Sequence, residues 1–151
     1  ESLSEADWDA VLDTNLKGAW LCCQAVAATM KANRWGRIVN VSSMLGEVGL
    51  AGRTAYTASK GGLTLMTRTL ALEWAEHGIL VNALCPGPFL TDINLPLMND
   101  PAARAMLETR VPLARWGKPE ELAAAFVFLA SEASSFMTGA TLLIDGGYTA
   151  A

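Results

Sequence analysis

Apolar residues recur along the chain with helical and strand-like periods, and the order of these stretches predicts the fold. The first stretch is helical and runs to about residue 30. Its apolar stripe consists of Trp8, Val11, Leu12, Ala19, Cys22, Val26 and Met30. Ser4 and Asp7 have the spacing of a capping box, which places the start of this helix near Ser4. Asn15 is a polar residue within the stripe, and alone it would be read as a buried structural amide or a solvated position.

Two further helices are expected. One spans about 54–75, ends at Gly78, which suits a left-handed cap, and carries the apolar stripe Leu63, Met66, Leu70 and Trp74. The other begins at Pro119, because proline suits the first turn of a helix, and ends near Ala130. Between them, residues 92–110 read as a lid with a short helix. Three of its apolar residues face either substrate or the core: Leu95, Leu97 and Met98.

Three short apolar runs predict β-strands over residues 37–43, 79–86 and 140–144. Because these strands alternate with helices, the expected sheet is parallel and the fold class is α/β. In open sheets of this kind, ligands bind beyond the carboxyl ends of the strands. Gly46, Gly49 and Gly52 follow the first strand without forming a dinucleotide fingerprint, and we expect them to give a flexible loop beside the substrate.

Composition and charge exclude several kinds of partner. The 151 residues are 52% hydrophobic, which predicts one compact domain, and the net charge of −4 makes nucleic acid an unexpected partner. No apolar run reaches the ~18–20 residues of a membrane span, so no membrane association is expected. Three cysteines without a disulfide framework indicate a reducing, cytoplasmic location. With one histidine and no cysteine pair at ligand spacing, no metal site is expected.

The candidate chemistry lies in Ser43, Tyr56 and Lys60. Ser43 stands at the end of the first predicted strand, while Tyr56 and Lys60 are spaced to share one face of the following helix. At ~4.5 Å and an effective dielectric of about 20, an ammonium stabilises a phenolate by roughly 3–4 kcal/mol. The pair therefore suits general acid–base catalysis, and a neighbouring hydroxyl suits orientation of a substrate oxygen. Taken singly, these residues also occur in ordinary structural roles.

The segment Tyr56-Thr-Ala-Ser-Lys60 resembles the Tyr-x-x-x-Lys motif of the short-chain dehydrogenase/reductase family. Ser43 lies thirteen residues earlier (56 − 43), which matches the catalytic serine of that family better than its neighbour Ser42 does. The resemblance implies hydride transfer between NAD or NADP and a carbinol or ketone carbon. It assigns the acid–base role to Tyr56, substrate orientation to Ser43, and support of the phenolate and binding of the nicotinamide ribose to Lys60.

Other segments carry the same resemblance. The stretch around Asn15 resembles the family's asparagine-bearing helix, which implies that Asn15 completes a tetrad and holds a water in a proton relay. The run Pro86-Gly-Pro-Phe-Leu-Thr91 is similar to the family's Pro-Gly-x-x-x-Thr segment. By this resemblance the backbone near Phe89 and the hydroxyl of Thr91 hold the nicotinamide carboxamide, and Pro86 and Gly87 belong to the same cofactor-binding segment. An ordinary strand-to-loop turn is the alternative reading of this run.

The resemblance spans essentially the whole chain, yet the family's glycine-rich phosphate-binding turn is not found in it. We therefore expect residues 1–151 to be a partial domain, the C-terminal half of a doubly wound (Rossmann-type) sheet, binding dinucleotide weakly or not at all alone. The implied substrate is a small polar molecule such as a sugar or sugar acid, with a 3-oxoacyl thioester as the alternative. The implied assembly is a homodimer or homotetramer through the Asn15 and Tyr56 helices. The rival hypothesis is a non-catalytic fragment or interaction module that keeps those helices.

Overall fold

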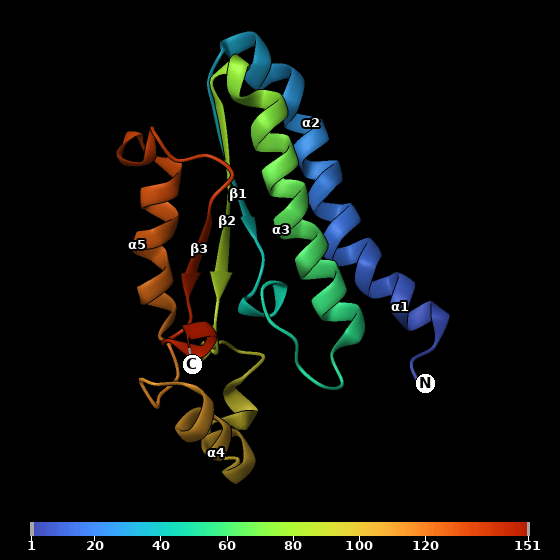
Figure 1. Cartoon of the computed structure of the whole chain (residues 1–151), viewed down its shortest axis with the longest axis vertical. Coiled ribbons are helices and arrows are strands. Elements are labelled where there is room, and N and C mark those ends of the chain that lie inside the picture. Colours follow the sequence, from blue (N-terminus) through green and yellow to red (C-terminus); the bar gives the residue numbers. More distant parts are fainter. Residues whose placement is uncertain (1, 151) are drawn as a thin grey trace.

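A computed structural model describes residues 2–150 as a three-stranded parallel sheet with helices on both faces (Figure 1). The strands are β1 (Gly36–Val41), β2 (Ile79–Pro86) and β3 (Thr141–Ile144), in the order β1-β2-β3. β1 pairs with β2 along its whole length, whereas β3 pairs only with the carboxyl-terminal half of β2. The predicted α/β class with three parallel strands is confirmed.

The helices form a layer on each face of the sheet. One layer holds α1 (Glu5–Leu12), a π-helical turn (Asp13–Lys17), α2 (Gly18–Asn33) and α3 (Thr54–Trp74). The other face is covered by α5 (Pro119–Ala130), and α4 (Pro101–Arg110) lies beyond the carboxyl ends of the strands (Figure 1). None of the helices described in residues 2–150 is long and apolar enough to cross a bilayer.

Two helix ends follow the predicted capping chemistry. The side chain of Ser4 accepts a hydrogen bond from the Asp7 N–H at 3.1 Å, which caps α1. At the far end of α3, a short 3₁₀ turn ends at Gly78, whose φ of 72° is left-handed. A Cβ at Gly78 would also collide with the carbonyl oxygen of Arg34, so both the left-handed backbone and this close contact require glycine.

The central strand is the most buried element. Its residues Ile79, Val81, Ala83, Leu84 and Cys85 are all 0% exposed. A strand covered by helices on both faces reads as a near-continuous apolar run, and the sequence of β2 is such a run with Asn82 as its polar exception. Leu70 and Trp74 of α3 pack against it from one side and Leu129 of α5 packs from the other, so the core has one part on each face.

The first predicted stripe is wrong at Cys22 and Val26, whereas Met30 packs against the core as predicted. The pattern placed Cys22 and Val26 on the buried face, but both are exposed, and Cys23 and Ala27 pack against the core instead. The π turn explains the shift, because its wider turn holds one extra residue and rotates the helix that follows. Asn15 lies inside this turn.

The predicted lid contains a 3₁₀ turn (Leu95–Leu97) and α4. Leu95, Leu97 and Met98 do not enter the core, since they are 49%, 41% and 50% exposed, whereas Leu107 of α4 is 4% exposed and belongs to it. The structure therefore excludes core packing for Leu95, Leu97 and Met98 within the part of the chain it describes.

Candidate active site

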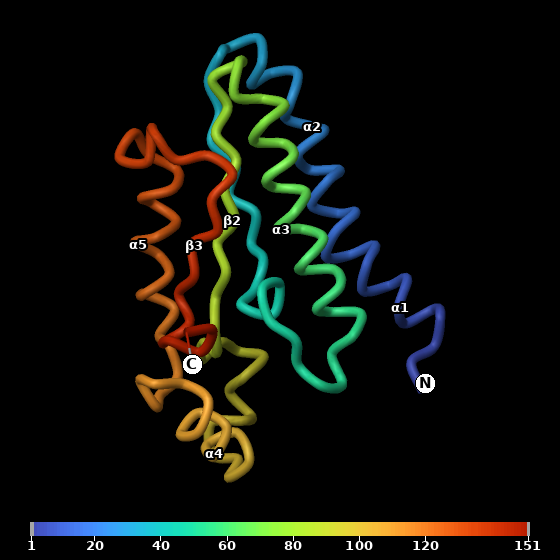
Figure 2. Tube along the Cα trace, in the orientation of Figure 1, coloured from blue at the N-terminus to red at the C-terminus, as the bar shows by residue number. Residues whose placement is uncertain are grey.

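Ser43 and Tyr56 lie at the carboxyl edge of the sheet, on either side of one loop. β1 ends at Val41, two residues earlier than the predicted end of the strand, and Ser43 caps a 3₁₀ turn by accepting a hydrogen bond from the Leu45 N–H at 3.1 Å. The chain then crosses this edge and enters α3, whose first turn carries Tyr56 (Figure 2). Tyr56 is half-buried and packs against the cluster that contains Met44 and Leu45, the two residues that follow Ser43 in the chain.

Lys60 is fixed between Tyr56 and β1. Its Nζ lies 5.8 Å from the centroid of the Tyr56 ring and donates a hydrogen bond to the Val41 carbonyl at 2.8 Å. Burial lowers the pKa of Lys60, while the nearby side chain of Cys85 acts in the opposite direction. The ammonium is thus held beside the phenol ring by a backbone group at the end of the strand.

The alternative serine, Ser42, has a structural role. Its hydroxyl is 2.9 Å from the Lys60 carbonyl, to which it donates, and 3.0 Å from the hydroxyl of Thr64. Both groups belong to α3. Ser42 and Ser43 are both buried, at 3% and 7% exposed, but only the Ser42 hydroxyl is bonded to α3. Ser42 therefore fastens the loop to the helix, which favours Ser43 for contact with substrate.

Cys85 of β2 lies next to Ser42. Burial raises the pKa of its thiol, which suits a packing residue.

Gly46 differs from the expected flexible loop residue. A Cβ there would lie 2.8 Å from the Ser42 hydroxyl and 2.9 Å from the Lys60 carbonyl oxygen. Only glycine lets the loop approach the backbone of α3 this closely. At Gly49, by contrast, an added Cβ would meet nothing within 4 Å. The sequence showed a glycine at this position but not the distant residues that require it.

Asn15 is joined to the same helix through Ser59. The Asn15 Nδ2 donates to the Ser59 hydroxyl at 3.1 Å, and that hydroxyl donates to the Tyr56 carbonyl at 2.8 Å. Ser59 is 0% exposed. Sequence reasoning missed Ser59, although it stands directly before Lys60 in the motif, because its partner is 44 residues away.

The predicted carboxamide-binding residues follow β2 at the same edge of the sheet. The Gly87 N–H donates to the Ile144 carbonyl at 2.8 Å, and Phe89 is 6% exposed and pairs with Gly117. Pro86 is half-buried at the end of β2, and Thr91 is exposed. Phe89 is therefore mainly a packing residue, whereas the Thr91 side chain is accessible.

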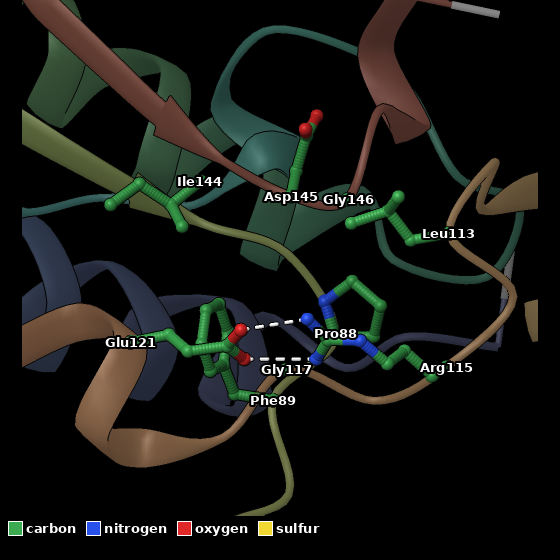
Figure 3. A pocket seen from close by; sticks show the side chains of 9 residues that line it. All are labelled: Pro88, Phe89, Leu113, Arg115, Gly117, Glu121, Ile144, Asp145 and Gly146. Carbon is green, nitrogen blue, oxygen red and sulfur yellow. Dashed lines mark hydrogen bonds and ion pairs between the residues drawn. The ribbon is translucent and has the colours of Figure 1, made fainter.

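A cavity of about 80 Å³ lies beside Phe89 at the base of the lid (Figure 3). Across it Arg115 donates to both oxygens of Glu121, at 2.9 and 2.7 Å. The hydrogen bond from Arg115 lowers the pKa of Glu121 to about 2. Burial raises the pKa of Asp145, but hydrogen bonds from Thr149 and Gly147 outweigh it and leave a net lowering. These charges are satisfied locally: Arg115 and Glu121 brace the segment before α5, and Asp145 braces the turn after β3, so none is presented to a ligand.

Within residues 2–150, the His, Cys, Asp and Glu side chains form no group that could hold a metal ion. The described residues also contain no glycine-rich turn leading from a strand directly into a helix, as a pyrophosphate site requires. What they offer toward a dinucleotide is an ammonium at Lys60, a phenol at Tyr56 and an accessible side chain at Thr91, all at one edge of the sheet. This donor set fits the nicotinamide end of such a molecule and not its phosphates.

Comparison with known proteins gives consistent matches over almost the full chain. A family model described as enoyl-(acyl carrier protein) reductase matches residues 1–149. The gluconate 5-dehydrogenase of Gluconobacter oxydans is 41% identical over 149 residues, which cover 99% of this chain and 58% of that protein. The 3-oxoacyl-(acyl-carrier-protein) reductase of Thermotoga maritima is 47% identical over 145 residues, covering 96% of this chain and 58% of that protein.

Solved structures agree with these matches. The crystal structure of a gluconate 5-dehydrogenase from Burkholderia cenocepacia, in complex with NADP and tartrate, has a TM-score of 0.95 and 40% sequence identity. The match covers 99% of this chain and 59% of that one. The chain therefore spans a little over half the length of the relatives it matches.

Proposed function

The chain belongs to the short-chain dehydrogenase/reductase family, and from this premise we propose that it is the catalytic, C-terminal part of an NAD- or NADP-dependent oxidoreductase acting on a sugar acid. The observation that carries the proposal is the placement of Lys60 beside Tyr56, at the strand end where Ser43 lies. In the complete protein a preceding segment would supply the phosphate-binding turn and a strand beside β1, which is an edge strand among the described residues.

Each site residue has one role in this proposal. Tyr56 accepts the proton of the substrate hydroxyl during oxidation and returns it to the carbonyl oxygen during reduction. Lys60 stabilises the phenolate form of Tyr56 by charge. Ser43 donates a hydrogen bond to the substrate oxygen and so aligns the reacting carbon, and Asn15 supports the relay that carries the proton to solvent. By holding the reacting groups in a productive geometry, these residues would accelerate the reaction.

The nicotinamide group, when bound, supplies the hydride chemistry. Lys60 would hold its ribose. Its carboxamide would be held by the backbone near Phe89 and by the hydroxyl of Thr91, whose side chain is exposed, with Pro86 and Gly87 in the same segment. Gly87 approaches Asp145 so closely that a Cβ would lie 2.5 Å from its Cα. The backbone after β2 is therefore held in a defined position by glycine.

The substrate class rests on the relatives. Two of them are named for gluconate chemistry: the Gluconobacter enzyme and a 5-keto-D-gluconate 5-reductase of Escherichia coli that is 42% identical over 143 residues. The Thermotoga relative keeps a 3-oxoacyl thioester as the alternative substrate. In this proposal the lid residues Leu95, Leu97 and Met98 contact the substrate, and their exposure is compatible with that role.

The proposed assembly is a homodimer or homotetramer. A groove of about 510 Å³ runs between the π turn and α3, lined by Leu12, Leu16, Trp20, Gly62 and Met66 among others. Leu65 on the same helix is 60% exposed. Such an apolar surface suits a second copy of these helices. Three unpaired thiols accord with the cytoplasmic location that we include in the proposal.

The test uses the complete protein with NADP and gluconate, and with NADPH and an acetoacetyl thioester. Tyr56→Phe should lower kcat by about 10²- to 10⁴-fold, the usual contribution of a general acid–base group, with NADP binding nearly unchanged. Tyr148→Phe is the matched control, since Tyr148 is the other tyrosine and packs in the same cluster.

A Tyr56→Phe variant with near-native kcat would overturn the proposal. A complete protein that neither binds NADPH nor turns over either substrate would favour the rival hypothesis of an interaction module. Turnover of the thioester alone would correct the substrate class and leave the catalytic assignment in place.

A further inference from the structure

Ser59 occupies an unusual position between two residues of the candidate site. Its hydroxyl accepts a hydrogen bond from the amide of Asn15 at 3.1 Å and donates one to the backbone carbonyl of Tyr56 at 2.8 Å. The residue is 0% exposed, so its hydroxyl is shielded from water, while its partners Asn15 and Tyr56 are half-buried. A hydrogen bond in such surroundings is electrostatically stronger than one at the surface.

The π turn brings Asn15 to this hydroxyl. Leu16, the next residue of the turn, lies so close to α3 that a Cβ at Gly62 would come within 2.9 Å of its Cδ2. The two helices therefore touch through a small residue at the level where Asn15 meets Ser59. This contact limits the separation between the turn and the helix that carries Tyr56 and Lys60.

Resting on the proposed function, we propose that Ser59 is a positioning residue for the proton relay. It holds the Asn15 amide against the Tyr56–Lys60 helix and thereby sets where the relay begins. Without the hydroxyl, the amide loses its partner and Asn15 is free to turn away. A small displacement of a group that moves a proton is costly in rate, because reaction requires a narrow range of geometries.

The same helix offers a matched comparison at Thr67. Its hydroxyl donates to the Leu63 carbonyl at 2.8 Å and accepts from the amide of Asn40 at 2.9 Å, and the residue is also 0% exposed. Both Ser59 and Thr67 thus join an asparagine amide to an α3 carbonyl. Only the asparagine bound to Ser59 belongs to the candidate site, so the pair separates a catalytic effect from a loss of stability.

The experiment compares Ser59→Ala with Thr67→Val in the complete protein, with gluconate and NADP as probes. We expect similar falls in melting temperature for the two variants. We expect kcat to fall about 10- to 100-fold for Ser59→Ala and to stay within about twofold for Thr67→Val, with the KM for NADP unchanged in both. If Ser59 acts through Asn15, the double variant Asn15→Ala/Ser59→Ala should be no slower than Asn15→Ala alone.

Two results would overturn the proposal: an equal loss of kcat in Ser59→Ala and Thr67→Val, or losses that multiply in the double variant. Should Ser59→Ala fail to fold, Ser59→Cys keeps a weak donor of similar size, and the same cycle with Asn15→Ala decides. Failure of the proposed function shows itself separately, as near-native turnover by Tyr56→Phe. If Tyr56→Phe is inactive while Ser59→Ala behaves like Thr67→Val, only the role of Ser59 is lost.

Discussion

The close approach of Gly46 to α3 predicts that even one methyl group at this position disturbs the candidate site. In Gly46→Ala the new Cβ would lie 2.8 Å from the Ser42 hydroxyl and 2.9 and 3.0 Å from the O and C atoms of Lys60. Two of these three atoms are helix backbone and cannot rotate away. The loop that carries Ser42 and Ser43 must therefore move outward from the helix that carries Lys60.

The cost can be worked from these contacts. Overpacking of this kind destabilises by about 1–3 kcal/mol. The hydrogen bond from Ser42 to the Lys60 carbonyl, 2.9 Å long, would be stretched or lost, which adds about 1 kcal/mol. The free energy of unfolding should thus fall by about 2–4 kcal/mol. At about 2–4 °C per kcal/mol for a protein of this size class, the melting temperature should fall by about 4–16 °C.

Thermal melts followed by circular dichroism, together with kcat, measure both effects in the complete protein. Gly49→Ala is the matched control, because a Cβ there would meet no atom within 4 Å. Since alanine also restricts the unfolded chain, this control should be neutral or stabilised by up to about 1 kcal/mol. Displacement of Ser43 from Tyr56 should lower kcat more than tenfold in Gly46→Ala alone.

Equal melting temperatures for the Gly46→Ala and Gly49→Ala variants would refute the reasoning. The loop would then have room to spare, and its position would not depend on contact with α3. A destabilised Gly46→Ala variant with native kcat would keep the packing argument and refute the link from packing to the site.

Two further predictions concern charge and assembly. The pKa of Glu121, about 2, lies below its ordinary value of 4.5, so its pair with Arg115 stabilises the fold fully above about pH 4.5 and loses this effect as pH falls towards 2. The difference in melting temperature between the native protein and Glu121→Gln should therefore shrink over that range. A constant difference would contradict this prediction. Leu65→Glu should shift the assembly towards monomer in light scattering, with little change in the stability of the monomer. The control Ile93→Glu changes an 87% exposed lid residue and should leave the assembly intact. An unchanged assembly in Leu65→Glu would refute the proposed interface.

Much of the fold could be predicted because its signals are local. Pro119 marks the start of α5, Pro86 and Gly87 mark the end of β2, and Ser4 and Gly78 cap their helices as expected. Each of these residues acts on its own backbone or on the next turn. Such effects are readable without knowing what lies nearby in space.

The register of α2 was not predictable from the apolar pattern. Cys22 and Val26 form as good a stripe as Cys23 and Ala27, because all four are apolar. The choice between them depends on the π turn, which no residue in 13–17 announces by its type.

The candidate site shows the same contrast between residues with local signals and residues that depend on distant contacts. Ser43, Tyr56 and Lys60 were found from spacing within one short stretch, and the structure gathers them at one edge of the sheet. Gly46 and Ser59 gain their importance from contacts with other elements, and single-sequence reasoning has no access to those contacts. Residues that hold a site together were thus harder to predict than residues that perform its chemistry.

The π turn lets the long N-terminal helix hold one residue more than an unbroken α-helix of the same span. Each residue of an α-helix advances the side chains by about 100°, so in an unbroken α-helix the residues after Lys17 would be rotated by about that angle. Deleting one residue within 13–17 should therefore leave Cys23 and Ala27 facing the core, whereas deleting one residue early in α2 should rotate the rest of that helix away from it.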